Sequence, residues 1–86
     1  MVAPNPFRHS TTVHYSIDNT ARVSICIYDI TGTLKNTLVD NIVSKGLYTV
    51  IWDGVNSNND PLSAGVYFIE LKADSYVTSY KILLTE

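Results

Sequence analysis

Two histidines, His9 and His14, are the side chains best suited to ligate a metal ion or to act as a general base. They lie five positions apart, a spacing that points them to opposite faces of an extended chain. Neither has a cysteine or a second histidine at the spacing that zinc sites use. We therefore expect both histidines at the surface, without a metal.

The segment Asp53–Asp60 is the best candidate for calcium, because calcium takes oxygen ligands and this stretch is rich in them. The candidate ligands are Asp53, Asn56, Asn58 and Asp60. Pro61, however, replaces the glycine that makes the sharp turn of a calcium loop, and Tyr67 stands where a bidentate glutamate would close the site. Asparagine and aspartate also favour ordinary turns. A structural turn is therefore the prediction, and weak calcium binding is the alternative.

Nucleophilic catalysis requires a base beside the nucleophile and a group that orients this base. Cys26, the one cysteine, lies between two isoleucines and away from any helix N-terminus that would lower its pKa. The serines are scattered without a Gly-x-Ser-x-Gly sequence, and the four glycines are isolated, so no phosphate-binding loop is present. We predict that the protein is not an enzyme, has no catalytic residues and needs no cofactor.

Length and composition restrict the possible functions further. A chain of 86 residues forms one domain, and 45% apolar with 16% charged residues is too apolar for a disordered chain. The net charge of −2, with the basic residues spread along the chain, indicates no nucleic-acid partner. No apolar run approaches the ~20 residues that span a bilayer, so we expect no membrane insertion.

The elements that must position these side chains are short strands. Six segments alternate apolar and polar residues with period two, one of them (Leu34–Val43) less regularly than the others, and turn signals separate them. These segments are Thr11–Ile17, Ala21–Ile30, Leu34–Val43, Leu47–Trp52, Gly65–Ala73 and Tyr76–Leu84. The pattern predicts an all-β, immunoglobulin-like antiparallel sandwich of about seven strands over residues 1–86, with residues 1–10 as an extended entry or linker segment. A small closed barrel is the alternative.

Residues that share one face of these segments predict the hydrophobic core. The expected core is Val13, Tyr15, Val23, Ile25, Ile27, Val50, Trp52, Tyr67, Ile69 and Leu71. Its aromatic members alternate in register with aliphatic residues, which favours packing over an exposed sugar-binding face. Tyr76 and Tyr80, in the last segment, stay open as members of an interface.

Several local motifs occur along the chain in a fixed order. They are Pro4-Asn5-Pro6-Phe7, Ser10-Thr11-Thr12-Val13 with Tyr15, Val23 to Asp29 followed by Gly32, Trp52-Asp53-Gly54, Ala64-Gly65-Val66-Tyr67-Phe68 and Lys81-Ile82-Leu83-Leu84. This series resembles the C-terminal sorting domain of type IX secretion cargo and the closely related immunoglobulin-like domain of flagellar hook-capping proteins. The resemblance covers essentially the whole chain.

The resemblance implies an address rather than an enzyme. The domain would follow an upstream cargo domain, be recognised by the outer-membrane translocon, and be removed by a sortase-like peptidase. The protein would then be secreted, or held at the cell surface, after passing the periplasm of a Gram-negative bacterium. The alternative is a structural accessory or spacer module of a secreted hydrolase or of a flagellar hook-cap assembly.

The resemblance also assigns roles to residues. It implies that the translocon recognises Lys81, Ile82, Leu83 and Leu84, and that Trp52, Asp53, Gly54, Gly65 and Tyr67 are structural. Asn59 occupies a position where relatives usually have glycine, and we expect its backbone to adopt the left-handed conformation that asparagine tolerates. Tyr80 replaces the second of two adjacent lysines.

Overall fold

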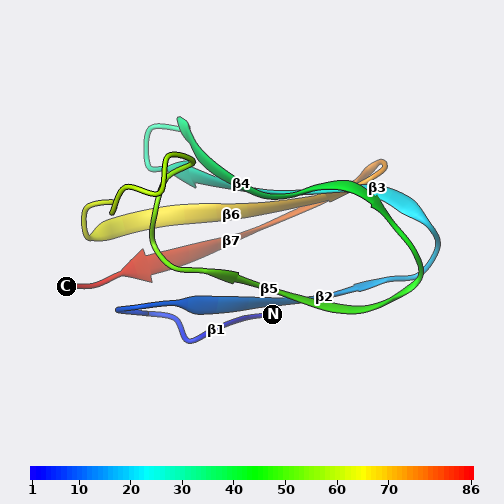
Figure 1. The fold of residues 1–86 in the computed structure, drawn as a ribbon, viewed down its shortest axis with the longest axis horizontal. Helices are drawn as coiled ribbons and strands as arrows, with labels where there is room; N and C mark the ends of the chain where they lie inside the picture. The colour runs from blue at the N-terminus through cyan, green and yellow to red at the C-terminus, as the bar shows by residue number, and fades with distance from the viewer.

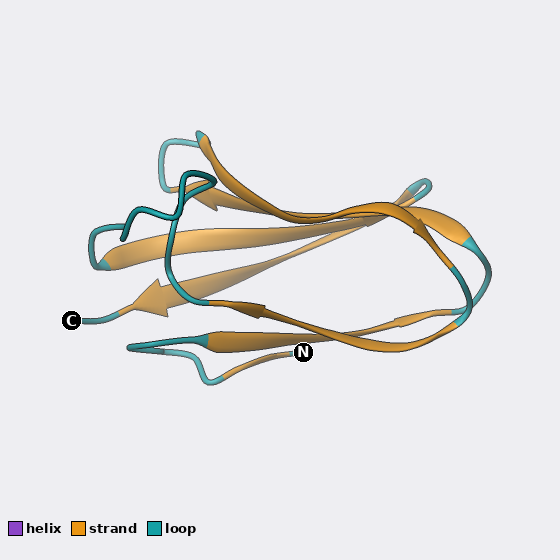
Figure 2. Ribbon diagram, viewed as in Figure 1, coloured by secondary structure: helices purple, strands orange, loops and turns teal.

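The computed structural model describes residues 1–86 and contains seven strands and no helix. The strands are β1 (Val2–Ala3), β2 (Thr11–Ile17), β3 (Ala21–Asp29), β4 (Leu34–Val43), β5 (Gly46–Trp52), β6 (Gly65–Ala73) and β7 (Tyr76–Leu84). They form a three-stranded sheet in the order β1-β2-β5 and a four-stranded sheet in the order β4-β3-β6-β7. The two sheets lie over one another as layers (Figures 1 and 2). The predicted antiparallel sandwich is therefore confirmed, and the closed barrel is excluded.

Alternation along the central strands builds the core between the sheets. On β3, Val23, Ile25 and Ile27 are completely buried, while the residues between them face outward. Burying one such aliphatic side chain is worth about 1.5–3 kcal/mol. Eight of the ten predicted core residues are buried. The other two, Tyr15 and Val50, are half-buried and pack against the core from the three-stranded sheet.

The N-terminal segment belongs to the domain and does not form a linker, contrary to that part of the prediction. The strand β1 pairs with β2, with Val2 opposite Val13. Phe7 is only 2% exposed and forms a parallel bridge with Leu84. Residues 1–10 therefore close one side of the sandwich, and Phe7 joins the core together with Ile17, Ile82 and Leu84.

The strand β4 is irregular, as its uneven pattern of apolar residues suggests. Its pairing with β3 shifts register between Ile25 and Cys26 and again between Ile27 and Tyr28. Each such irregularity changes which side chains of the strand face the core. Leu38 and Val43 consequently pack against the core, whereas Leu34 is 52% exposed.

The connection between β3 and β4 is held by one carboxylate. Oδ1 of Asp29 accepts hydrogen bonds from the Thr31 amide at 2.9 Å, the Thr31 hydroxyl at 2.7 Å and the Thr33 amide at 3.0 Å. These donors, the Thr31 side chain above all, lower the pKa of Asp29 below its usual value of 3.8. The tight turn therefore depends on an ionised aspartate at its first position.

None of the elements is a helix that is long and apolar enough to cross a membrane.

Candidate functional site

The side chains with the most obvious chemistry lie apart from one another. His9 and His14 are exposed, the first before β2 and the second on its outer face. Cys26 is half-buried on β3, and its Sγ lies 3.8 Å from the hydroxyl of Thr37. No group of three or more histidine, cysteine, aspartate or glutamate side chains is placed to hold a metal ion. The two histidines therefore lie apart from each other, whereas Cys26 stands opposite Glu70 of β6.

The Asp53–Asp60 loop uses its oxygen atoms for its own turn. Oδ1 of Asn56 accepts hydrogen bonds from the amides of Asn58 at 2.9 Å and Asp60 at 3.0 Å. Asn59 has a φ of 67°, which confirms the expected left-handed conformation. These contacts support the structural turn, because the best-placed oxygen already accepts two amide hydrogens. Calcium binding by Asp53, Asn56, Asn58 and Asp60 stays an untested alternative.

An aromatic cluster fixes this loop to the core. Trp52 is fully buried, and its ring lies 5.3 Å from that of Phe7 and 5.5 Å from that of Tyr67. Its indole Nε1 donates a 3.0 Å hydrogen bond to the carbonyl of Val55, the residue just before the Asn56–Asp60 turn. Trp52 and Tyr67, both members of the predicted core, are therefore in direct contact.

For two of the expected structural residues, Gly54 and Tyr67, the structure shows why that residue type is needed. Gly54 has a φ of 75°, and a side chain there would also contact Leu84 at 3.4 Å. The hydroxyl of Tyr67 donates a 2.7 Å hydrogen bond to the carbonyl of Ser63, four residues earlier. A tyrosine near the start of this strand that bonds back to the preceding corner is a hallmark of immunoglobulin-like sandwiches. Asp53 is exposed, and Gly65 begins β6 opposite Leu84.

The closing segment Lys81–Leu84 divides between the core and the surface. Ile82 is 1% exposed and Leu84 is 6% exposed, so both are core residues and neither is accessible to a partner. Lys81 is exposed, and Leu83 is 40% exposed on the outer face. Recognition of this segment by side chains would therefore rest on Lys81 and Leu83.

The backbone of this segment is already paired along the free side of β7. The Asn5 side chain donates to the Lys81 carbonyl at 2.9 Å and accepts from the Leu83 amide at 3.0 Å. The Phe7 amide donates to the Leu83 carbonyl at 2.9 Å, and its carbonyl accepts from Thr85 at 2.8 Å. A partner strand cannot add to β7 here, although an edge strand at the end of the chain suggests that it could. Sequence analysis missed this role of Asn5 and Phe7, which the Pro4-Asn5-Pro6-Phe7 motif alone signals.

The first half of β7 stays open. Tyr76 is 62% exposed and Tyr80 is 37% exposed, and both lie outside the segment that Asn5 and Phe7 cover. Their exposure agrees with the suggestion that they belong to an interface.

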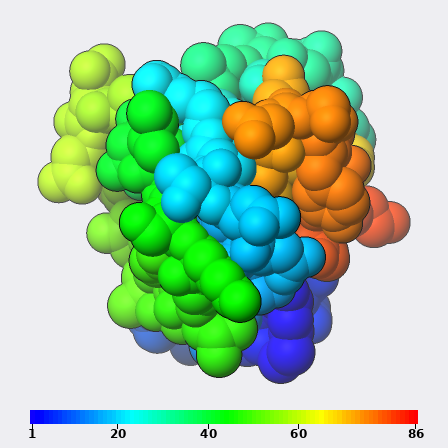
Figure 3. Space-filling view, turned by 90° about the vertical axis from the view of Figure 1, so that its right-hand side faces the viewer, coloured from blue at the N-terminus to red at the C-terminus, as the bar shows by residue number.

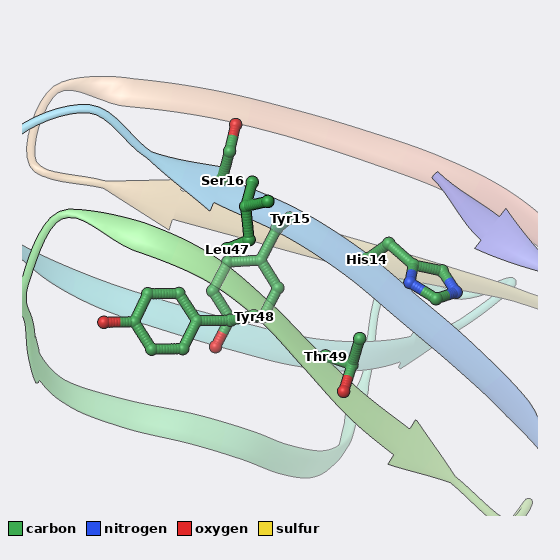
Figure 4. A pocket seen from close by; sticks show the side chains of 6 residues that line it. All are labelled: His14, Tyr15, Ser16, Leu47, Tyr48 and Thr49. Carbon is green, nitrogen blue, oxygen red and sulfur yellow. The ribbon is translucent and has the colours of Figure 1, made fainter.

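A shallow depression lies on the three-stranded sheet, where Tyr15 of β2 and Tyr48 of β5 stand opposite each other (Figure 4). Their rings stack with centroids 5.5 Å apart, and the Tyr48 hydroxyl donates a 2.8 Å hydrogen bond to the Ser44 carbonyl. Two effects raise the pKa of Tyr15: burial of its hydroxyl is the larger, and repulsion from the nearby Tyr48 is the smaller. The depression is lined by His14 and by no carboxylate or thiol, so it offers a contact surface with one imidazole and no carboxylate to orient it.

Comparison with known protein families gives one match, to the FlgD Ig-like domain over residues 8–76. The chain belongs to the FlgD Ig-like domain family. This family is a non-catalytic structural domain family, found in the flagellar hook-capping protein and in other proteins. The expectation that the domain is related to that of hook-capping proteins is thereby confirmed.

A solved structure agrees with the fold of the FlgD Ig-like domain. The crystal structure of FlgD from P. aeruginosa matches with a TM-score of 0.65 and 20% sequence identity. The match covers 87% of this chain and 59% of that chain, so this chain spans about three-fifths of the FlgD chain. Identity at this level supports the fold alone. A comparison with curated proteins found no match.

Membership in the FlgD Ig-like domain family agrees with the scattered positions of the reactive side chains. The family match includes Trp52, Gly54 and Tyr67, which build the core and its corner. It ends at Tyr76, so most of β7 lies beyond the matched residues. The arrangement of the β7 edge is therefore known from the structure of this chain and not from the family match.

Proposed function

We propose that this domain is a non-catalytic structural module, a spacer or accessory domain that joins or supports other parts of a larger protein or assembly. The observation that supports this most is the use of its polar groups. Four polar side chains form hydrogen bonds to nearby turns of the same chain: the Trp52 indole, the Tyr67 hydroxyl, the Asn56 carboxamide and the Asp29 carboxylate. Groups that elsewhere bind ligands here hold the connections of a rigid sandwich.

Replacement of the domain within its parent protein tests this proposal. A folded, unrelated immunoglobulin-like domain of similar length should preserve the activity or assembly of the parent protein, because a spacer acts through size and stiffness. A matched control carries the original domain with Trp52→Ala, which should unfold it and disrupt the parent protein. If the folded foreign domain fails where the original succeeds, a specific surface is required and the spacer proposal is wrong.

A second candidate is sorting through a type IX secretion system. It is supported by Lys81 and Leu83, two exposed side chains of β7 within the motif that carries the resemblance. In this proposal the domain follows a cargo domain and is recognised at the outer membrane of a Gram-negative bacterium. The partner would contact side chains there, since Asn5 and Phe7 already occupy the backbone.

A reporter fusion distinguishes the two candidates. A periplasmic reporter that carries this domain at its C-terminus should reach the surface or medium of a host with a type IX system. Lys81→Ala should impair export while leaving the melting temperature nearly unchanged, and Lys72→Ala, an exposed lysine on β6, is the matched control. If the folded fusion stays in the periplasm while the host exports its own cargo, the sorting candidate fails.

A further inference from the structure

The strand β5 forms an open edge of the three-stranded sheet, since it pairs with β2 on one side only. On the far side of β2, Met1 and His14 exchange both backbone hydrogen bonds, at 2.9 and 2.7 Å. Backbone groups alternate in direction along an antiparallel strand. Val13 and Tyr15 therefore bond toward β5, where they stand opposite Val50 and Tyr48.

It follows that the intervening residues of β5, Leu47, Thr49 and Ile51, direct their N–H and C=O groups away from the sheet. No backbone hydrogen bond outside the strands uses any of these groups, and no side chain bonds to them. The edge thus offers three donors and three acceptors in an extended row. Such a row is a template for another strand.

The side chains along this edge add apolar surface and no charge. Leu47 is 87% exposed and Ile51 is 64% exposed, on the outer face of the sheet. The residues beside them on β2, namely Thr12, His14 and Ser16, are not formally charged. Figure 3 shows β5, in green, along one margin of the molecule, with the yellow-green Asp53–Asp60 loop above it.

The other sheet edges are shorter, irregular or partly covered, and the first half of β7 is the one other stretch that stays open. The strand β1 is only two residues long, and half of β7 is covered by Asn5 and Phe7. The strand β4 has two register shifts, the charged Lys35 and Asp40, and a bond from the Ser57 amide to the Lys35 carbonyl. Short strands, bulges and charges are the devices by which sheet edges avoid pairing.

We infer that β5 pairs antiparallel with β5 of a second copy of this chain, about a two-fold axis through Thr49. Thr49 is the central residue of Gly46–Trp52, so this register uses the whole edge. Thr49 faces Thr49 of the second copy, and Leu47 faces its Ile51. All six outward donors and acceptors of each strand then find partners, and the sandwiches share one six-stranded sheet, β1-β2-β5-β5-β2-β1.

A second copy fits this edge better than an arbitrary strand because the edge is complementary to itself. Each Leu47 gains an apolar neighbour in Ile51 of the other copy, and cross-strand pairs of this kind stabilise a sheet. No charged side chain faces another across the axis, and the net charge of −2 is carried elsewhere. A shift of the register by two residues leaves only two of the three hydrogen-bonded pairs between the strands. This loss of a third of the new hydrogen bonds favours the centred arrangement.

The contact is one strand wide, well below the ~1,200 Å² of a standard stable interface. We therefore expect a reversible dimer that forms at high protein concentration. This inference concerns the isolated chain and does not rest on the proposed function, so either can fail alone.

Sedimentation equilibrium of the 86-residue chain, from micromolar to millimolar concentration, tests for the dimer. The average mass should rise from the monomer toward twice that value. Thr49→Lys should weaken association about tenfold or more, because two ammonium groups then meet across the axis. His14→Lys is the matched control, since it adds the same charge on the same face one strand away. A monomer throughout the concentration range overturns the inference, as does equal weakening by both variants.

Disulfide trapping tests the register. In a Cys26→Ser background, Thr49→Cys places two thiols in a directly opposed pair, with Cα atoms about 5.5 Å apart and within disulfide range. Leu47→Cys places its thiols about four residues apart along the strands, which is too far. Thr49→Cys should therefore form the linked dimer about tenfold faster or more. Equal rates overturn the centred pairing, and so does faster trapping by Ser79→Cys on β7.

Discussion

Removal of the Phe7 ring should show how strongly the N-terminal segment belongs to the domain. Phe7 is 2% exposed, its ring lies 5.3 Å from that of Trp52, and its backbone bonds to Leu83 and Thr85. Phe7→Ala keeps the backbone bonds and loses the ring. Deleting a buried phenylalanine costs about 3–5 kcal/mol, through the lost transfer free energy and the cavity left behind.

This loss is large for a domain of this size. Typical free energies of unfolding are about 5–15 kcal/mol, so the variant should lose a large fraction of its stability. At about 4–8 °C per kcal/mol, even the lower limit predicts that the melting temperature falls by about 12–24 °C. Urea unfolding followed by tryptophan fluorescence measures the loss, because Trp52 is the single tryptophan.

Two neighbouring substitutions serve as controls. Asn5→Ala removes the two side-chain bonds to β7 and should cost about 1–3 kcal/mol, since each such bond contributes about 0.5–1.5 kcal/mol. Arg8→Ala alters an exposed residue and should stay within about 0.5 kcal/mol of the wild type. If Phe7→Ala unfolds at the same urea concentration as Arg8→Ala, the segment does not stabilise the sandwich and the assignment of Phe7 to the core is wrong.

Four further predictions follow from the same contacts. Trp52→Ala should cost about 3–5 kcal/mol in chemical unfolding, and a wild-type melting curve would contradict the assigned register. Tyr67→Phe should cost about 1 kcal/mol by losing the bond to the Ser63 carbonyl; no measurable loss would show that this bond is not stabilising. The lowered pKa of Asp29 stabilises the fold above pH 3.8, and this contribution disappears as the pH falls through the folded pKa. The melting temperature of Asp29→Ala should therefore lie below that of the wild type at pH 6 and approach it on acidification, whereas a gap that stays constant would refute the linkage. Calcium should leave the melting temperature unchanged, and a rise of several degrees that chelator reverses would assign a site to the Asp53–Asp60 loop.

Period-two alternation is enough to predict most of this fold. It identifies the strands and their buried faces, because Val23, Ile25 and Ile27 can share a face only if the chain is extended. The predicted segments Gly65–Ala73 and Tyr76–Leu84 leave two residues between them, and the structure joins them there as a hairpin, with Ala73 opposite Tyr76. The position of a strand and its buried face can be predicted from local spacing, because both depend on residues that are neighbours in the sequence.

Contacts between distant parts of the chain could not be predicted in this way. Phe7 meets Leu84 across nearly the whole sequence, and no local pattern specifies this pairing. The register shifts of β4 depend on how β3 accommodates its partner, which again is a tertiary effect. The polar groups of Trp52 and Tyr67 are expected to need hydrogen-bond partners. Which carbonyls accept from them, those of Val55 and Ser63, depends on the conformation of the loops.

The same distinction applies to the surface through which the domain can act. The sequence draws attention to β7, because a last strand and a chain end are accessible by default. The structure shows that Asn5 and Phe7 already pair with half of that edge, whereas the outer side of β5, in the middle of the sequence, has no partner strand along its whole length. Accessibility of a strand therefore depends on its place in the sheet and not on its place in the chain. The edge of this structural module that is open from end to end and uncharged is β5, and the residues whose backbone faces outward there are Leu47, Thr49 and Ile51.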